Sequence, residues 1–340
     1  MFLATLGLAM KRACPLVVTF LWGAGGALAA EPFRIGVPVE CAFGTVCSVQ
    51  NYFDLDPGPG RLDPGCGRLS YDGHDGTDFR VRDRIAMEEG VRVVAAADGV
   101  VKATRDGMAD VSVREGGLEA VSGREAGNGV LIDHGGGWET QYSHLRSGSV
   151  SVRRGDRVKA GTSLGLIGLS GQTEFPHLHF TLRRDGVEID PYTGAAGAWT
   201  CGSPLAPIWT EDAAASLTYV PTGLLIAGFS PAPPEAEAIR RGDQRLGARA
   251  ADPAALVLWA DVFGAEAGDV QSFRIVGPGG SVILDEKSVL DASNVSWFAF
   301  AGRRRPAEGW DAGTYVGSYE LARNGVTMIS HRVEIEISPE

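Results

Sequence analysis

The chain has 340 residues, of which 44% are hydrophobic, and its 31 lysines and arginines are outnumbered by 42 aspartates and glutamates. The net charge of -11 argues against a nucleic-acid partner, because a phosphate backbone is bound through an excess of positive charge. The length exceeds what one hydrophobic core usually organises, so we expect two domains.

Residues 1–30 have the layout of a secretory signal peptide. They contain no acidic residue, a basic pair at Lys11 and Arg12, an apolar run from Leu16 to Trp22 and a small-residue ending, Ala27-Leu28-Ala29. The apolar run is shorter than the roughly 20 residues that a membrane helix needs, and no later stretch approaches that length. We therefore expect an exported protein without a transmembrane segment, located in the periplasm or outside the cell.

Residues 31–70 are rich in glycine and proline, and we interpret them as an irregular lead-in fixed by disulfides. They contain Cys41, Cys47 and Cys66, and the fourth cysteine after the signal peptide is Cys201. An even number of cysteines in an exported chain indicates two disulfides, whereas a cysteine-ligated zinc site normally shows Cys-x-x-Cys spacing. We expect Cys41 to pair with Cys47 in a tight loop, and Cys66 with Cys201 across the two ends of the following domain.

Residues 71–205 have the texture of an antiparallel β domain. Short β-branched segments are separated by glycines, and none shows a sustained period of 3.6 residues. A polar, Gly-rich and charged stretch at 106–126 interrupts this pattern, and we interpret it as an inserted surface loop. The predicted strands cover 91–95, 99–103, 129–133, 140–143, 164–167 and 177–182.

Residues 206–240 include a Pro- and Ala-rich stretch and are predicted to be a linker. Residues 241–340 again contain short strand-like segments, the last two joined around Asn324-Gly325, a strong hairpin signal. Their number favours a β-sandwich of immunoglobulin-like character, although the Cys…Trp…Cys pattern of antibody domains is absent. The sequence shows no catalytic constellation in this part. The predicted strands cover 255–263, 272–276, 281–284, 295–301, 314–321 and 326–337.

Histidines carry the most informative pattern in the sequence. His177 and His179 lie in a predicted strand, where residues i and i+2 point to the same face about 7 Å apart, so both imidazoles face one site. His74 and Asp78 would be about 13 Å apart in a straight strand, which is too far for one ion. The chain must therefore bend near Gly76 if these two side chains share a metal.

One aspartate and two histidines would supply three ligands, and a water molecule in the fourth position completes the open tetrahedral site of catalytic zinc. His144 and His177 would then be left for proton transfer and oxyanion stabilisation. A hydrogen-bonded structural role is the alternative for each histidine, and neither His-x-His nor His-x-x-x-Asp is specific by itself. Spacing alone does not decide between these two interpretations.

A series of motifs runs through residues 73–182 in a fixed order. They are Gly73-His74-x-Gly76-x-Asp78, Val93-x-Ala95-x-x-x-Gly99-x-Val101, Gly127-Asn128-x-Val130-x-Ile132-x-His134, Tyr142-x-His144-Leu145, Val152-x-x-Gly155-x-x-Val158-x-x-Gly161, Gly165-x-x-Gly168-x-x-Gly171 and Pro176-His177-Leu178-His179-Phe180. In this series the segment resembles the LytM-type, lysostaphin-like M23 metallopeptidases. The resemblance implies a lysostaphin-like antiparallel β catalytic domain and one zinc ion per chain.

The resemblance also implies roles for five residues. Positions that match His74, Asp78 and His179 bind zinc in that family, and positions that match His144 and His177 serve catalysis. His134 falls outside this set, and we assign it a structural role.

The function that the resemblance implies is zinc-dependent hydrolysis of the peptide cross-links of bacterial peptidoglycan, so the expected partner is a wall peptide. One alternative is a non-catalytic LytM-type regulator of a cell-wall amidase, because some family members have lost ligands; the complete ligand set here argues against it. Another is a secreted protease that acts on proteins, since the family includes such members. The sequence does not identify a protein regulator.

Overall fold

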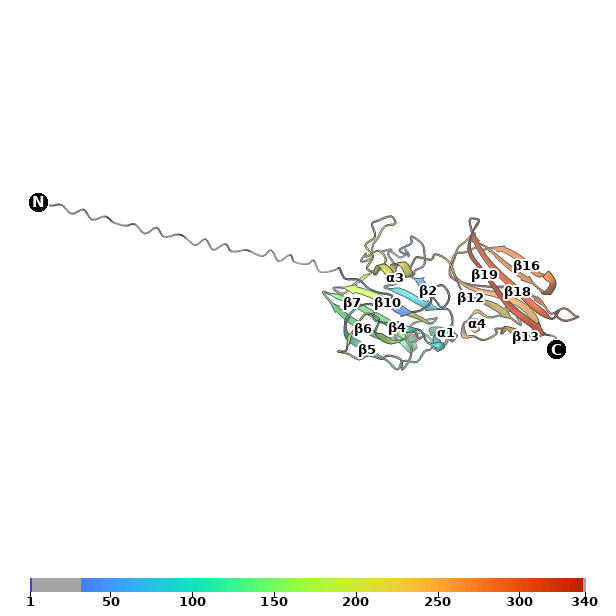
Figure 1. The fold of residues 1–340 in the computed structure, drawn as a ribbon, viewed down its shortest axis with the longest axis horizontal. Helices are drawn as coiled ribbons and strands as arrows, with labels where there is room; N and C mark the ends of the chain where they lie inside the picture. Colours follow the sequence, from blue (N-terminus) through green and yellow to red (C-terminus); the bar gives the residue numbers. More distant parts are fainter. Residues whose placement is uncertain (2–31, 339–340) are drawn as a thin grey trace. The chain divides into compact units, whose positions relative to one another are not determined.

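The structure, a computed structural model, describes Met1 and residues 32–338 (Figure 1). Apart from Met1, the predicted signal peptide lies outside the described residues. No helix within 32–338 is long and apolar enough to cross a membrane. Strands dominate the described part of the chain, and all but one of the ladders between them are antiparallel, which confirms the all-β class.

An eight-stranded antiparallel sheet forms the scaffold of the first domain, with strand order β2-β3-β10-β7-β6-β5-β8 and β11 paired to β10. A smaller sheet of order β1-β4-β9 lies in the same domain. All six strands predicted for this region are present. The large sheet contains β2 (Cys47–Asn51), β3 (Thr77–Val81), β5 (Gly99–Arg105), β6 (Asn128–Gly135), β7 (Trp138–Leu145), β8 (Arg157–Val158), β10 (His177–Arg184) and β11 (Val187–Ile189), and the small one β1 (Val39–Glu40), β4 (Arg92–Val94) and β9 (Ser163–Leu166).

Short helices accompany these strands. The polar stretch at 106–126 contains two of them, and it is tied to its surroundings: Asp110 accepts hydrogen bonds from the backbone N–H groups of Leu169 at 2.8 Å and Ser147 at 2.9 Å. This surface insertion is therefore ordered by polar contacts. The helices are α1 (Arg84–Glu89), α2 (Val113–Gly116), the 3₁₀ turn η1 (Leu118–Val121) and α3 (Glu211–Ser216).

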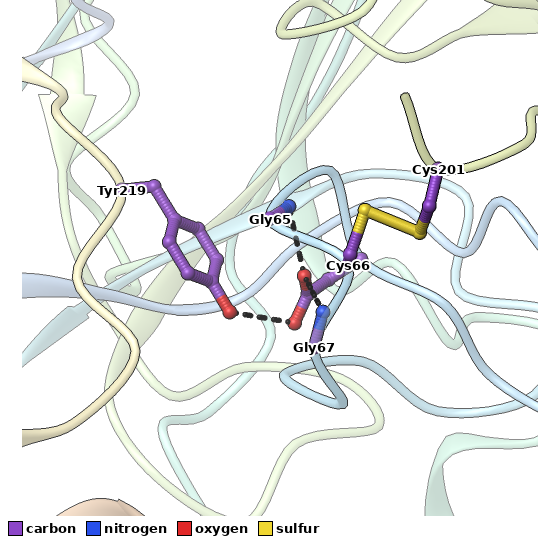
Figure 2. Close-up of a disulfide and its surroundings, with 6 residues drawn as sticks. Gly65, Cys66, Gly67, Cys201 and Tyr219 are labelled. Carbon is purple, nitrogen blue, oxygen red and sulfur yellow. Dashed lines mark hydrogen bonds between the residues drawn. A yellow bond between two sulfur atoms is a disulfide. The ribbon is translucent and has the colours of Figure 1, made fainter. Parts of the chain in front are cut away.

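The segment 31–70, expected to be an irregular lead-in, contributes strands to both sheets. Its β2 pairs with β3, and its β1 pairs with β4. The two disulfides are Cys41–Cys47 and Cys66–Cys201, which confirms the predicted connectivity. The second disulfide, drawn in Figure 2, joins positions 135 residues apart. Cys66 precedes β3 and Cys201 follows β11.

The loop that carries Cys66 is organised by the buried carboxylate of Asp63. Its Oδ1 accepts hydrogen bonds from the backbone N–H groups of Gly65 at 2.9 Å and Gly67 at 2.8 Å, and its Oδ2 accepts one from the Tyr219 hydroxyl at 3.0 Å (Figure 2). Oδ2 also accepts a hydrogen bond from the backbone N–H of Leu69 at 2.7 Å, and four donors to one buried carboxylate satisfy the charge that burial would otherwise penalise. The loop therefore has a defined shape at the disulfide.

Two sheets form the β-sandwich of the C-terminal part, one of order β12-β14-β17 and one of order β13-β19-β18-β15-β16. Their facing side chains, among them Leu258, Phe273 and Tyr319, share one buried core. Its immunoglobulin-like character remains a proposal. The elements are β12 (Gly223–Ser230), α4 (Ala236–Arg241), β13 (Arg249–Ala251), β14 (Ala255–Ala265), β15 (Val270–Val276), η2 (Pro278–Gly280), β16 (Val282–Val289), β17 (Asn294–Arg304), β18 (Gly313–Arg323) and β19 (Val326–Ser338).

The segment 206–240, expected to be a linker, contains α3, β12 and α4 instead of being irregular throughout. Strand β12 pairs with β14 along its length. The sequence did not reveal this strand because it lies between Pro221 and the run Pro231-Ala232-Pro233-Pro234, whose composition indicated a linker. Gly228 is needed for packing: a Cβ atom there would lie 2.6 Å from the Trp259 ring.

Candidate metal centre

Strands β3 and β10 bring the sequence-predicted site residues together. In their antiparallel register His179 lies opposite Asp78. The chain bends at Gly76, as the spacing required, and this returns His74 to the same place. Gly76 also allows a close approach, because a Cβ atom there would lie 2.8 Å from the His179 ring and 2.7 Å from the Phe180 carbonyl oxygen.

Three side-chain atoms converge at this point. His74 Nε2 lies 3.2 Å from Asp78 Oδ1 and 3.2 Å from His179 Nδ1, and His179 Nδ1 lies 3.0 Å from Asp78 Oδ1. Ligands about 2.0 Å from a tetrahedral zinc are separated from one another by roughly 3.3 Å. The triangle of donor atoms is therefore close to the size that such an ion requires, and this group could hold a metal ion.

The outward-facing ring nitrogens show which inner atoms carry lone pairs. His74 Nδ1 lies 2.6 Å from the Tyr52 carbonyl oxygen, which can only accept, so Nδ1 holds the proton and Nε2 faces the cluster as an acceptor. His179 Nε2 lies 3.0 Å from Asp75 Oδ1, which leaves Nδ1 as its inward acceptor. Three acceptors facing one another repel unless a cation lies between them. This arrangement fits a metal better than it fits a set of structural hydrogen bonds.

Charge and burial reinforce this conclusion. Burial opposes ionisation of Asp78, yet the neighbouring His74 and His177 bring the pKa of its carboxyl well below the usual value. Burial would likewise lower the pKa of His179, but hydrogen bonds to Asp75 and Asp78 raise it to about 9. A pKa of about 9 means that, without a cation, the ring of His179 carries a proton on Nδ1 as well, and a bound cation would replace that proton and leave Nδ1 as the acceptor described above.

His144 and His177 lie beside the three converging atoms. Their ring centroids are 4.7 Å apart, and His177 Nε2 is 3.4 Å from Asp78 Oδ1. His177 Nδ1 lies 2.9 Å from the Phe175 carbonyl oxygen and His144 Nδ1 lies 2.8 Å from that of Ser170, so each ring donates outward and keeps Nε2 as an acceptor.

The backbone at His144 is unusual. Its φ of 62° lies in the left-handed region, which non-glycine residues rarely occupy and which is enriched at functional sites. Burial lowers the pKa of its imidazole well below the ordinary value, with the charges of His177 and His179 acting in the same direction. His144 is therefore held in its neutral form.

Comparison with known proteins agrees with this geometry. Residues 72–191 match the model of Peptidase family M23. This segment is an M23 peptidase domain. It carries all five residues of the predicted site.

The relatives of the M23 domain are considerably longer proteins. Peptidoglycan DD-endopeptidase ShyA of Vibrio cholerae is 36% identical over 124 residues, which is 36% of this chain and 23% of ShyA. DD-carboxypeptidase/endopeptidase Mpg of Neisseria meningitidis is 32% identical over 109 residues, 32% of this chain and 23% of Mpg. The aligned part of this chain thus spans about a quarter of the length of these relatives. Among solved structures, a zinc-containing peptidase from Vibrio cholerae aligns at 28% identity over 42% of this chain and 39% of that one, with a TM-score of 0.27.

The sequence did not reveal the groups that hydrogen-bond to the three predicted metal ligands and so orient them. Asn51 binds the second oxygen of Asp78, Asp75 binds His179, and the Tyr52 carbonyl binds His74. Asp75 was detectable as the acid beside His74, whereas the other two reach the site only through sheet pairing. His134 lies between the Asp98 carbonyl oxygen and the Thr140 hydroxyl, 2.7 Å from each, which agrees with the predicted structural role.

Proposed function

We propose that this protein is an exported, zinc-dependent endopeptidase that hydrolyses peptide cross-links of bacterial peptidoglycan. The observation that carries the proposal is the convergence of three acceptor atoms, from His74, Asp78 and His179, beside two further histidines. The printed activities of the relatives, peptidoglycan DD-endopeptidase and DD-carboxypeptidase/endopeptidase, support the substrate class.

His74, Asp78 and His179 would hold one zinc ion per chain. When bound, zinc polarises a carbonyl group and brings the pKa of water toward neutrality. Asp78 offers Oδ1 to the site, and Asp75 fixes the ring of His179. Both carboxylates at the cluster are thus engaged by histidines, which does not favour glycoside hydrolysis, a reaction that usually requires two carboxylates flanking the scissile bond.

We assign proton transfer to His144 and His177. In each ring Nδ1 carries a hydrogen and donates it to a backbone carbonyl oxygen. Each ring can therefore take up a further proton only at Nε2. After that uptake Nε2 becomes a donor, which can stabilise an oxyanion or protonate a departing amine. One histidine can therefore act as base while the other acts as donor, without any further titratable residue.

The test is digestion of purified sacculi by the chain from which residues 1–30 have been removed, with the released fragments identified by mass spectrometry. We expect cross-linked dimers to become monomers, the reaction to stop when a chelator is added, and no new reducing sugar ends to form. A His144→Ala variant should be inactive. Cleavage of the sugar strands, or full activity of that variant, would contradict the proposal.

The same preparation distinguishes the proposed enzyme from the two alternatives. A protein that binds no zinc, leaves sacculi intact and stimulates a wall amidase would be a regulator. A protein that degrades casein but not sacculi would be a general protease.

A further inference from the structure

A pocket of about 550 Å³ adjoins the histidine cluster, by which we mean His74, Asp78, His144, His177 and His179. Both domains form the walls of this pocket. The C-terminal part contributes side chains from α4 and β17. The M23 domain contributes part of the cluster itself. Residues that define the two sides are Asp78, His144 and His177 on one and Arg240, Val295 and Ser296 on the other.

Ion pairs hold the C-terminal wall against the M23 domain. Arg245 Nη1 lies 2.9 Å from Oδ2 of Asp83, a buried residue at the start of α1. Arg240 binds both oxygens of the buried Asp261, at 2.7 and 2.8 Å, and Asp261 in turn lies 3.9 Å from the buried Arg80 of β3. Pairs that are withdrawn from water are screened little, so they fix this wall in place.

The charges that line the pocket are balanced with one exception. Arg80, Arg114 and Arg240 each have an acidic partner. Arg61, which is only partly exposed, has neither an ion pair nor a hydrogen bond with any of residues 32–338. It therefore presents an uncompensated positive charge to the pocket.

The loop that carries Arg61 is fixed relative to the histidine cluster. Asp54 Oδ1 accepts hydrogen bonds from the backbone N–H groups on both sides of Arg61, those of Asp56 at 3.1 Å and Leu62 at 3.0 Å. The backbone N–H of Asp54 itself donates to the His74 carbonyl oxygen at 2.8 Å. The position of this cation is thus tied to a residue of the candidate metal centre, and little ordering of the loop is needed on binding.

We propose that this pocket binds a peptide segment bearing a free carboxylate, with Arg61 as the carboxylate's partner and the C-terminal domain as the second wall. A guanidinium suits this role because its planar N–H groups match the two oxygens of a carboxylate. The proposal rests on the proposed function, since it places the bound segment next to the peptide bond to be cleaved. It assigns to the C-terminal domain a direct part in substrate binding.

The first test uses peptidoglycan dimers in two forms, with carboxyl groups free and with carboxyl groups converted to amides. Wild type should cleave the free form with a kcat/KM roughly tenfold higher, as expected for one charge-assisted hydrogen bond. Arg61→Gln should abolish this preference, mainly by raising KM for the free form. Arg68→Gln is the matched control, because Arg68 lies in the same segment, is exposed and does not line this pocket. Equal rates for the two forms in wild type, or an undiminished preference in Arg61→Gln, would overturn the proposal.

The second test fills the pocket from the C-terminal side. Val295→Trp should raise KM for the free dimer roughly tenfold with kcat and the melting temperature little changed, whereas Val289→Trp, at an exposed position outside the pocket, should not. An unchanged KM in Val295→Trp would exclude the C-terminal wall from binding.

Binding separates failure of this inference from failure of the proposed function. If wild type cleaves neither form, calorimetric titration of His144→Ala with both dimers still reports on the pocket. If His144→Ala binds the free form more tightly, and the double variant His144→Ala/Arg61→Gln does not, the pocket proposal is supported even though the proposed function has failed. Equal binding of both forms would overturn it.

Discussion

Asn51 donates a hydrogen bond from Nδ2 to Oδ2 of Asp78 over 2.8 Å, and both side chains are buried. The bond leaves only Oδ1 of that carboxylate facing His74 and His179. Because β2 pairs with β3, the segment at 47–51 orients a residue that lies 27 positions later in the chain. The pairing of β2 with β3 therefore orients the carboxylate of Asp78 independently of a bound metal.

Replacing Asn51 with alanine should weaken zinc binding about 10- to 100-fold, the usual effect of losing a group that orients a metal ligand. The reason is that Asp78 would be free to rotate and would lose the partner of its second oxygen. Competition with a chromogenic chelator measures the affinity. Asn294→Ala serves as the control, since within residues 32–338 the Asn294 side chain bonds only to the Ala292 carbonyl oxygen. Equal affinities in the two variants would show that Asn51 does not support the metal.

His179 and His177 should respond differently to alanine substitution. His179→Ala removes one of three converging donor atoms, so the purified variant should contain no stoichiometric zinc. His177→Ala leaves that triangle intact, so it should retain one zinc per chain and lose activity instead. Metal content by inductively coupled plasma spectrometry, measured beside sacculus digestion, provides both values. Equal zinc loss in the two variants would refute this division of roles.

The two disulfides should contribute unequally to stability. Closing a loop of 135 residues is worth about 5 kcal/mol in the chain-entropy model, against about 2 kcal/mol for a loop of 6 residues. The double variant Cys66→Ser/Cys201→Ser should therefore lower the free energy of unfolding more than Cys41→Ser/Cys47→Ser does. Urea unfolding at neutral pH compares them. The reverse order would mean that the local structure near Cys41 matters more than loop closure.

Local spacing predicted the two pairs within the candidate site, whereas their combination into one site with His144 depended on the resemblance of residues 73–182 to the M23 family, because Asp78 and His179 lie 101 residues apart. The pair His177 and His179 shares a strand face, and a single bend at Gly76 joins His74 to Asp78. Strand β3 itself was not predicted. Its residues alternate between polar and apolar from Asp78 to Val81, yet all five are buried, because Asp78 and Arg80 are bonded to the side chains of the neighbouring strand β2.

Non-local contacts account for what the sequence did not reveal. Asn51 acquires its role through pairing with β3, and Arg240 and Val295 reach the pocket only because the sandwich packs against the M23 domain. No periodicity or motif encodes such neighbours. The connectivity of the disulfides, in contrast, followed from loop lengths that the sequence states directly.

Asp190 should make stability depend on pH. It is fully buried after β11, and its Oδ2 accepts hydrogen bonds from the Thr193 backbone N–H at 2.9 Å and hydroxyl at 2.7 Å. Burial, aided by the nearby charge of Asp63, raises the pKa of its carboxyl from 3.8 to about 6. The folded protein thus holds this proton more tightly than the unfolded chain does, so the associated stability is complete below about pH 4 and is lost as the pH rises through about 6.

Asp190→Asn keeps an acceptor for Thr193 and cannot ionise. The free energy of unfolding of the variant minus that of wild type should therefore increase by about 3 kcal/mol between pH 4 and pH 7.5. Urea unfolding of both proteins at several pH values gives this difference, and a value independent of pH would show that the buried carboxyl does not titrate in this range.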